Sequence, residues 1–305
     1  MRYVVTGAAG FIGSHLAEVL RARGDDVVSV DAFTDYYDLA EKEENARGLD
    51  VARIDLADES LELDGVDGVF HLAGQPGVRS FGDAFPLYLR RNVLATQRVF
   101  ESAAEAGVRV VYASSSSVYG EAERYPTPED ARPEPISPYG ITKVACEELA
   151  RAYSASFGLD AVGLRYFTVY GPRQRPDMFF RRVCDALTAG GTFEVYGTGE
   201  QSRSFTEVAD VVDATIAAMA GAPAGALYNV GGGEEASMLE AIAALERISG
   251  RGLEVTHVDR ARGDVRRTKA DVSRIRDALG WEPRVPLADG LARMWAWASA
   301  RVAAR

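Results

Sequence analysis

The chain has 305 residues, 47% of them hydrophobic and 26% charged, which is the composition of a globular protein with one large domain or two lobes. Its 45 acidic and 34 basic residues give a formal net charge of −11, so we expect neither nucleic acid nor a membrane surface as a partner. Two cysteines, Cys146 and Cys184, are too few for a disulfide framework, and no apolar run is long enough for a transmembrane helix. These features favour a cytoplasmic protein.

Short apolar segments alternate with helical patterns from residue 3 to residue 165. The strand-like segments cover residues 3–5, 27–30, 51–54, 69–72, 109–113 and 161–165, and helical spacing follows residue 12, spans about 87–106 and resumes at 139. This alternation predicts an α/β fold with a Rossmann-type doubly wound parallel sheet. Shorter elements follow, near 193–196, 207–220, 227–230, 237–249 and 287–302. We therefore expect a Rossmann domain over residues 1–170, to which some later segments return, and a smaller C-terminal substrate-binding lobe over 171–305.

A glycine-rich turn joins the first predicted strand to the first predicted helix. Its spacing is GxxGxxG, from Gly7 through Gly10 to Gly13. Glycines at these positions allow a tight turn and let the backbone approach a pyrophosphate at the helix N-terminus. The turn, with Phe11 and Ile12 inside it, therefore predicts a dinucleotide-binding site.

Acidic residues end the second and third predicted strands. Asp31 follows Gly13 by 18 residues. A carboxylate at this position accepts hydrogen bonds from a ribose diol and repels a 2′-phosphate, which favours NAD over NADP. Asp55 and Leu56 end the third strand and are candidates to contact the adenine. The alternative for these residues is an ordinary solvated strand end.

A proline-rich stretch over residues 114–138 is predicted to cross the carboxyl edge of the sheet, where such folds bind ligands. It opens with four serines, 114–117, and is followed by Tyr139 and Lys143, which share one face of a predicted helix. A phenol is a poor base at neutral pH unless a nearby positive charge stabilises the phenolate. The pair therefore predicts a general base, with a serine hydroxyl beside it; the alternative is a chance pair on an exposed helix.

These motifs together resemble the extended short-chain dehydrogenase/reductase family, in its branch of NAD-dependent nucleotide-sugar epimerases and dehydratases. GxxGxxG, HLAG, SSSSVYG, PYGITK and LRYFTVYG occur in the family's order over nearly the whole chain. The resemblance implies that Tyr139 is the base, Lys143 its partner and a ribose ligand, and Ser115 the hydroxyl that contacts the substrate. The NAD contacts that it also implies are Leu72, Ala73, Gln75, Asn92, Tyr139, Lys143 and Tyr166.

The resemblance implies that a hydride leaves C4 of the sugar for NAD and returns to its other face. The 4,6-dehydratases carry Asp-Glu where this chain has Ser116 and Ser117, and UDP-glucuronate decarboxylases carry Glu at the position of Ser117. Both departures favour 4-epimerisation through a transient 4-keto intermediate, and leave the dehydratase and the decarboxylase as alternatives. A non-catalytic NAD-binding regulator is a further alternative, against which the intact Ser115, Tyr139 and Lys143 speak.

The segment FTVYGPRQRPDM, residues 167–178, is similar to that of UDP-glucuronate 4-epimerases, whereas UDP-glucose 4-epimerases usually have Asn at the position of Thr168. The resemblance implies that Thr168, Arg175 and the serines Ser116 and Ser117 hold the sugar substrate, with Arg175 on its carboxylate. A guanidinium matches a carboxylate with two parallel hydrogen bonds. We therefore expect conversion of UDP-glucuronate to UDP-galacturonate. A UDP-glucose/UDP-galactose 4-epimerase, with Arg175 as a surface ion-pair residue, is the alternative.

The resemblance also extends to the part of the cleft that would hold the nucleotide. It implies that Arg203 binds the pyrophosphate of the UDP-sugar and that Tyr196 lies beside the uracil. Arg79 and Asp264 are further candidates, although Asp264 fits an exposed turn equally well. The three histidines are scattered, which predicts no metal site. A homodimer is usual in the family, and we expect one here.

Overall fold

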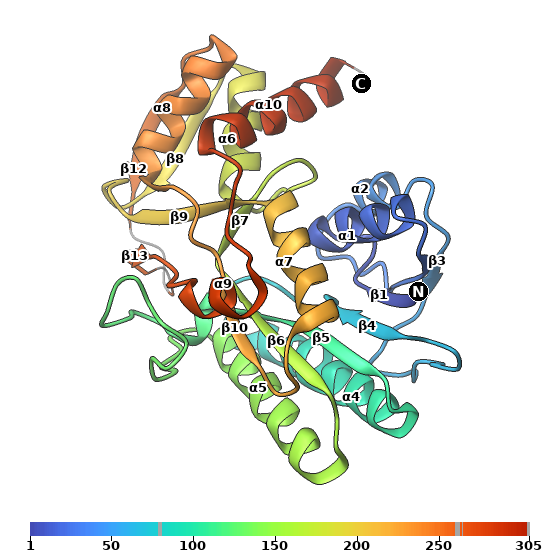
Figure 1. Cartoon of the computed structure of the whole chain (residues 1–305). Helices are drawn as coiled ribbons and strands as arrows, with labels where there is room; N and C mark the ends of the chain where they lie inside the picture. Colours follow the sequence, from blue (N-terminus) through green and yellow to red (C-terminus); the bar gives the residue numbers. More distant parts are fainter. Residues whose placement is uncertain (79–80, 260–262, 264, 304–305) are drawn as a thin grey trace.

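The computed structural model describes residues 1–78, 81–259, 263 and 265–303, and its centre is a seven-stranded parallel sheet (Figure 1). Its strands are β1 (Arg2–Thr6), β2 (Asp26–Asp31), β3 (Val51–Arg53), β4 (Gly68–His71), β5 (Arg109–Ser115), β6 (Ala161–Tyr166) and β10 (Leu227–Val230). The spatial order of the strands is β10-β6-β5-β4-β1-β2-β3, so the chain adds β2 and β3 on one side of β1 and the later strands on the other side. Doubly wound sheets bind ligands where this direction changes, which is between β1 and β4 here. The predicted Rossmann-type parallel sheet is therefore confirmed.

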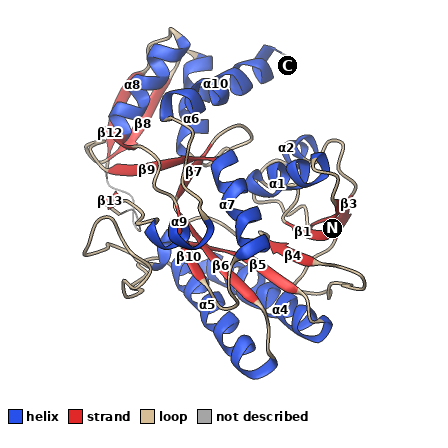
Figure 2. Cartoon of the chain, viewed as in Figure 1, coloured by secondary structure: helices blue, strands red, loops and turns tan. Residues whose placement is uncertain are grey.

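Helices cover both faces of this sheet because its strands are apolar on both faces (Figure 2). Val4 and Val5 of β1 point to opposite sides, and both are buried. Val5 belongs to a core shared with α1 (Phe11–Ala22) and α7 (Val208–Gly221). Val4 belongs to a second core, shared with α4 (Ala95–Ala106) and α5 (Pro138–Phe157). Strands buried in this way appear in the sequence as short continuous apolar runs.

The helix predicted over about 87–106 is present, but it begins slightly earlier and changes its winding. α3 (Phe85–Tyr88) continues without a break into the π-helical η2 (Leu89–Leu94) and then into α4. The helix predicted from residue 139 is α5, and Ser137 caps it by accepting a hydrogen bond from the Gly140 backbone N–H at 3.1 Å. Pro138 occupies the first turn of α5, where its missing N–H costs nothing.

The second half of the chain contributes to two regions. β10 pairs with β6 and is therefore a strand of the main sheet, and α7 packs on that sheet. Both elements follow residue 171 in the chain. The other elements after β6 build smaller sheets and helices with a core of their own, which Figure 1 shows at the end of the molecule away from α4 and α5. They are β7 (Thr168–Tyr170), α6 (Phe179–Ala189), β8 (Thr192–Tyr196), β9 (Ser202–Glu207), β11 (Glu235–Ser237), α8 (Met238–Ser249), β12 (Glu254–Val258), β13 (Arg267–Thr268) and α10 (Leu287–Ala303). The exception is α9 (Ser273–Leu279), whose Ile275 lies in the main-sheet core shared with α1 and α7.

Two short helical elements from earlier in the chain line the cavity that is described below. α2 (Leu39–Asn45) follows β2, and η3 (Ser116–Val118) follows β5. A one-turn helix, η1 (Gly82–Ala84), precedes α3.

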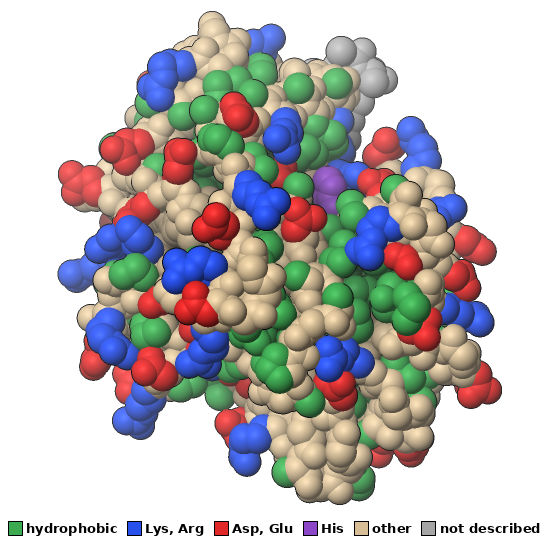
Figure 3. Space-filling view, in the orientation of Figure 1, with side chains coloured by type: hydrophobic (Ala, Val, Ile, Leu, Met, Phe, Trp, Pro, Cys, Tyr) green, Lys and Arg blue, Asp and Glu red, His purple; other side chains and the backbone are tan. Residues whose placement is uncertain are grey.

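The length of the helices and the distribution of charge describe the outside of the molecule. Among the described helices, none combines the length and the apolar character needed to cross a membrane. On the face drawn in Figure 3, acidic and basic side chains are interspersed. That face therefore presents no extended field of one sign.

Candidate active site

A large cavity runs along the carboxyl ends of the parallel strands and has a volume of about 640 Å³, within the range of ligand pockets. Of the residues predicted to contact the cofactor, those that line it are Gly7, Gly10, Phe11, Ile12, Gly13, Asp31, Asp55, Leu56, Leu72, Ala73, Gln75 and Tyr166. Of those predicted for catalysis or substrate binding, the lining residues are Ser115, Ser116, Ser117, Tyr139, Lys143, Thr168, Arg175, Tyr196 and Arg203. The fold thus brings these separate motifs to one cavity.

The glycine-rich turn at one end of the cavity leaves no room for side chains. Gly7 has φ +73°, and a Cβ there would lie 2.8 Å from the backbone nitrogen of Ala73. A Cβ on Gly13 would overlap the carbonyl oxygen of Gly7. The backbone between β1 and α1 is therefore open to the cavity, with the N-terminus of α1 beside it, which fits the pyrophosphate of a dinucleotide.

Asp31 is fixed at the end of β2 by two backbone contacts. Its Oδ2 accepts a hydrogen bond from the Ala9 N–H at 3.1 Å and its Oδ1 one from the Phe33 N–H at 2.7 Å. A carboxylate oxygen has a second lone pair, so Asp31 can still accept hydrogen bonds from a ribose diol. Asp55 lies at the end of β3 and forms an ion pair with Arg90 at 3.0 Å. The residues present thus fit NAD.

Two residues of the predicted cofactor set are held by the protein itself. Asn92 is fully buried and is not among the lining residues; its side chain accepts a hydrogen bond from the Gln75 N–H at 2.7 Å and donates to the Gln75 carbonyl at 3.1 Å. It therefore shapes the cavity wall through Gln75. Tyr166 lines the cavity, but its hydroxyl is buried and lies 2.8 Å from Thr215 Oγ1. Burial raises the pKa of Tyr166, which keeps this phenol protonated.

The three predicted catalytic residues meet where β5 ends and α5 begins. Lys143 Nζ donates to the Ala113 carbonyl at 2.8 Å and lies 5.8 Å from the centre of the Tyr139 ring. Ser115 Oγ donates to Ser117 Oγ at 3.1 Å. A Cβ on Gly140 would lie 2.5 Å from the Ser117 carbonyl oxygen, so α5 can approach the serine turn only because residue 140 is glycine.

A neutral histidine lies under this group. His71 is buried at the end of β4, with Nδ1 2.8 Å from Thr6 Oγ1 and Nε2 3.0 Å from Thr96 Oγ1. Burial, helped by the charge of Lys143, lowers the pKa of His71 to about 3. His71 therefore remains uncharged and adds no positive charge to those of Lys143 and Arg175 near Tyr139.

Arg175 lines the cavity from the loop after β7 and takes part in an ion pair. Its Nε and Nη2 each donate to the carboxylate of Asp177 at 3.0 Å, and its guanidinium lies 5.9 Å from the centre of the Tyr36 ring. Burial opposes the charge of Arg175 most strongly, but Asp177, with Tyr36 and Tyr139, more than offsets it, so the pKa of the guanidinium is raised. Arg175 is thus both an ion-pair residue and a permanent cation at the cavity.

The far end of the cavity is lined by β8 and β9. Arg203 is buried and donates to the backbone carbonyls of Ser202 and Val265, at 2.8 and 2.6 Å. Tyr196 lies at the end of β8, and the guanidinium of Arg182 is 5.9 Å from the centre of its ring. These cations and the aromatic ring suit a diphosphate joined to a flat base.

Three lining cations, Lys42, Arg91 and Arg182, were not predicted as site residues. Arg91 lies on η2, and its Nη1 donates to Gln75 Oε1 at 2.8 Å. Arg182 lies on α6, and Lys42 on α2 is buried with its Nζ donating to Thr34. Burial lowers the pKa of Lys42. No local spacing marks any of the three, since each reaches the cavity only through the packing of its helix. The predicted contacts Arg79 and Asp264 lie outside the described residues.

The described residues contain no group of three or more His, Cys, Asp or Glu side chains that could hold a metal ion. The sheet order, the glycine turn and the Tyr139–Lys143 pair define a Rossmann-fold protein with a dinucleotide-type cofactor site. More narrowly, the model of the NAD dependent epimerase/dehydratase family matches residues 3–231, and the chain belongs to that family.

Relatives and solved structures agree with this membership. The chain is 38% identical to a UDP-glucose 4-epimerase of Mycolicibacterium smegmatis, over 96% of this chain and 97% of the relative. It is 34% identical to a UDP-glucuronate 4-epimerase of Thermodesulfobacterium geofontis, over 98% and 97%. Its structure is similar to that of UDP-glucuronic acid 4-epimerase from Bacillus cereus in complex with UDP-glucuronic acid and NAD. That likeness has a TM-score of 0.95 at 37% identity, over 99% of this chain and 100% of the other.

Proposed function

We propose that the protein is an NAD-dependent UDP-glucuronate 4-epimerase, which converts UDP-glucuronate to UDP-galacturonate through a transient 4-keto sugar. The observation that carries this proposal is the placing of Arg175, Thr168 and Ser117 around the same cavity as Tyr139 and Lys143. The first three suit the carboxylate of a uronic acid, and the last two suit proton transfer. The similarity to the B. cereus enzyme supports the same substrate.

The proposed roles follow from the positions of the side chains. Tyr139, as phenolate, takes the proton of the C4 hydroxyl, and Lys143 beside it stabilises that phenolate. The Ser115 hydroxyl rotates away from Ser117 Oγ when the sugar binds and donates a hydrogen bond to the same sugar oxygen. NAD bound at the glycine turn would supply hydride acceptance and hydride return at C4. The 4-keto sugar turns before the hydride returns to its opposite face, and Tyr139 returns its proton to the C4 oxygen, so the sugar is changed only in configuration.

The proposed carboxylate contacts also protect the reaction from a side product. A 4-keto uronic acid is a β-keto acid, which loses CO₂ readily when its carboxylate bond aligns with the carbonyl π system. Arg175, Thr168 and Ser117 surround the carboxylate with a cation and two hydroxyls and keep that bond near the carbonyl plane. The sequence has no acid–base pair at Ser116 and Ser117 for water elimination, which favours epimerisation over dehydration.

A direct assay tests the function. Purified protein is incubated with UDP-glucuronate and, separately, with UDP-glucose, and the products are separated by chromatography. We expect a mixture of UDP-glucuronate and UDP-galacturonate, with much slower turnover of UDP-glucose. Epimerisation of UDP-glucose alone would replace the proposal with the second candidate.

That second candidate is a UDP-glucose 4-epimerase. Asp177 already neutralises Arg175 within the chain, an arrangement that also suits an uncharged sugar. The relative from M. smegmatis supports this candidate as well. The presence of Thr168 in place of the usual Asn argues for the acidic substrate.

We also propose the assembly and location expected from the family. Leu87, Leu94 and Ile141 are 42%, 39% and 51% exposed along α3, η2 and α5, and support a homodimer through helix packing. Both cysteines are buried free thiols, which supports a cytoplasmic protein. In this proposal residues 1–170, with β10 and α7, bind NAD, and the remainder of 171–305 binds the nucleotide sugar.

A further inference from the structure

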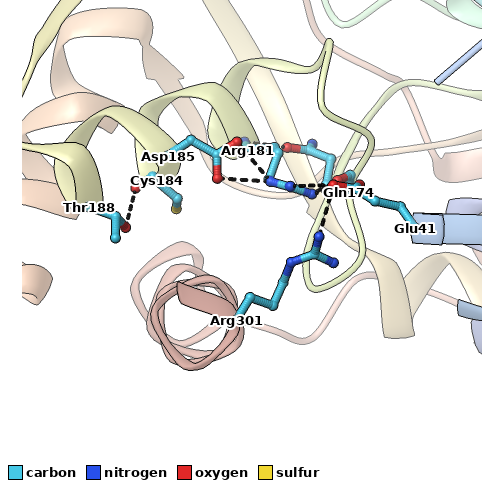
Figure 4. Close-up of polar contacts among 7 residues, drawn as sticks. All are labelled: Glu41, Gln174, Arg181, Cys184, Asp185, Thr188 and Arg301. Atoms are coloured by element: carbon cyan, nitrogen blue, oxygen red, sulfur yellow. Dashed lines mark hydrogen bonds and ion pairs between the residues drawn. The ribbon is translucent and has the colours of Figure 1, made fainter. Parts of the chain in front are cut away.

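A cluster of charged residues outside the cavity joins α2 to α6 and α10 (Figure 4). The two nitrogens Nη2 and Nη1 of Arg181, on α6, donate to the two carboxylate oxygens of Glu41, on α2, at 2.8 and 3.1 Å. Arg301, on α10, donates to Glu41 Oε1 at 2.8 Å. Both guanidinium groups also lie over the ring of Trp297, at 5.2 and 4.9 Å from its centre.

This cluster is shielded from water and separate from the ligand site. The side chains of Glu41 and Arg181 are 12% and 7% exposed, so their attraction is weakly screened by solvent. Glu41, Arg181 and Arg301 are not among the residues that line the cavity. Any effect of the cluster on ligands therefore passes through the segments that it holds.

On the α6 side, Arg181 holds the loop that carries Arg175. Its backbone N–H donates to Gln174 Oε1 at 3.0 Å, and its Nη1 donates to the Gln174 carbonyl at 3.4 Å. Gln174 is buried, and its Nε2 donates to the Val169 carbonyl at 3.0 Å. The residue before Arg175 is therefore fixed both to Arg181 and to β7.

On the α2 side, Glu41 shares its helix with Asn45, whose Nδ2 donates to the Ala9 carbonyl of the glycine turn at 3.3 Å. Lys42, the next residue, lines the cavity and donates to the Thr34 carbonyl and hydroxyl at 2.6 and 3.0 Å. The same segment carries Tyr36, whose hydroxyl donates to Asp177 at 3.3 Å. Residues 34–42 thus meet the Arg175 loop inside the cavity at Tyr36–Asp177, and are joined to it outside through Glu41 and Arg181.

We propose that the Glu41–Arg181 ion pair couples retention of the cofactor to recognition of the sugar carboxylate, with Glu41 as a positioning residue. The pair joins segment 34–42 to the loop that carries Arg175. When bound NAD fixes the position of the segment, the pair therefore also fixes the position of the loop, and the reverse holds when the sugar carboxylate fixes the loop. The part that concerns the carboxylate rests on the proposed function. The part that concerns the cofactor does not.

The test is Glu41→Gln, which removes the negative charge and nearly keeps the shape. We expect bound NAD to dissociate about tenfold faster, and the KM for UDP-glucuronate to rise about tenfold with kcat within about twofold, because only the position of the binding groups changes. NAD release is measured without substrate, by the nucleotide that remains bound after dilution. The matched control is Asp185→Asn, which removes the other carboxylate on Arg181, 2.9 and 3.0 Å from its Nε, within α6 itself. We expect no change in this control.

The outcomes separate the pair from general destabilisation and from the function itself. Unchanged values in Glu41→Gln, a change in only one of them, or equal changes in Asp185→Asn would overturn the coupling. If Glu41→Gln does not fold, Arg301→Gln takes its place, because it removes the more exposed of the two arginines that contact Glu41. We expect smaller increases in the rate of NAD dissociation and in the KM for UDP-glucuronate. No increase in either quantity would also overturn the coupling. If the native protein does not epimerise UDP-glucuronate, the proposed function fails, and the rate of NAD release alone decides whether the pair holds segment 34–42.

Discussion

Tyr139 owes its proposed role to neighbours that keep a positive charge beside it. Lys143 is held by the Ala113 carbonyl at 2.8 Å and stays 5.8 Å from the centre of the Tyr139 ring. Ser115 is fixed at the end of β5 by its hydrogen bond to Ser117. Neither hydrogen bond involves the Tyr139 hydroxyl, so removing that oxygen tests its role without disturbing Lys143 or Ser115.

We expect Tyr139→Phe to keep NAD bound and to lower kcat by at least ~10²-fold, because the base is lost while the cavity is preserved. NAD content and turnover of UDP-glucuronate are measured on the same preparation. Tyr153→Phe is the matched control, since Tyr153 lies on the same helix and its hydroxyl contacts Gln97 outside the cavity. Full activity of Tyr139→Phe would show that another group takes the proton.

Arg175 is the residue on which the proposed choice of substrate depends. We expect Arg175→Ala to raise the KM for UDP-glucuronate by about 10–100-fold, the effect of losing a paired, charged hydrogen bond. We also expect release of CO₂ with a UDP-pentose, because the keto acid is no longer held near the carbonyl plane. Both are followed by mass spectrometry of the products. Arg173→Ala, which removes an arginine paired with Glu18 outside the cavity, is the control. An unchanged KM without CO₂ would place the carboxylate contact elsewhere.

At the scale of elements, the turn between β1 and α1 sets the distance between sheet and helix. Gly13 lies in the first turn of α1, directly against the carbonyl of Gly7. Any side chain at Gly13 pushes α1 away from β1 and displaces the backbone that faces the cavity. The same close approach therefore serves both packing and binding.

We expect Gly13→Ala to lower the free energy of unfolding by about 1–3 kcal/mol, the usual cost of overpacking, and to weaken NAD binding at least tenfold. Urea unfolding and titration with NAD measure the two effects. Gly252→Ala is the control, since a Cβ there would meet no atom within 4 Å. Equal behaviour of both variants would mean that α1 can shift without loss.

Sequence periodicity located the elements whose buried positions are filled by apolar residues in a regular pattern. The strands of the main sheet are covered on both faces and appear as apolar runs, as in residues 3–5 of β1. β9 was not found, because its buried residues include Arg203, Ser204 and Glu207, whose polarity hides the strand pattern. β10 was found as a strand, but its place beside β6 depends on a pairing that no local pattern expresses.

The same distinction applies to the candidate site. The glycine turn and the Tyr139–Lys143 pair are local spacings, and both line the cavity. Lys42 and Arg182 reach the cavity through the packing of α2 and α6, and Glu41 contacts a residue 140 positions away. Contacts between such distant segments are fixed by the whole fold, so the sequence alone did not reveal them.

For the whole molecule, two poorly hydrated histidines link stability to pH. His15 joins α1 to the Arg175 loop, with Nε2 2.9 Å from the Pro172 carbonyl. Burial, with Arg173 nearby, lowers the pKa of His15 to about 4, and burial lowers that of His71 to about 3. In the unfolded chain both take a proton near pH ~6.5. Below that pH the unfolded state binds more protons than the folded state, so stability falls with pH until the folded pKa values are reached.

We therefore expect the native protein to lose about 1–2 kcal/mol between pH 7 and pH 5 through His15 alone. His15→Gln keeps an amide donor near the Pro172 carbonyl and removes the titrating group, so its loss over the same range is smaller by that amount. Urea midpoints at the two pH values measure the difference. His257→Gln, on the exposed side of β12, controls for substitution of a histidine as such. If His15→Gln and the native protein lose equal stability, the contact between α1 and the Arg175 loop is not the one that acid weakens. The pH sensitivity then belongs to His71 and the carboxylates of the ion pairs, and acid weakens those contacts first.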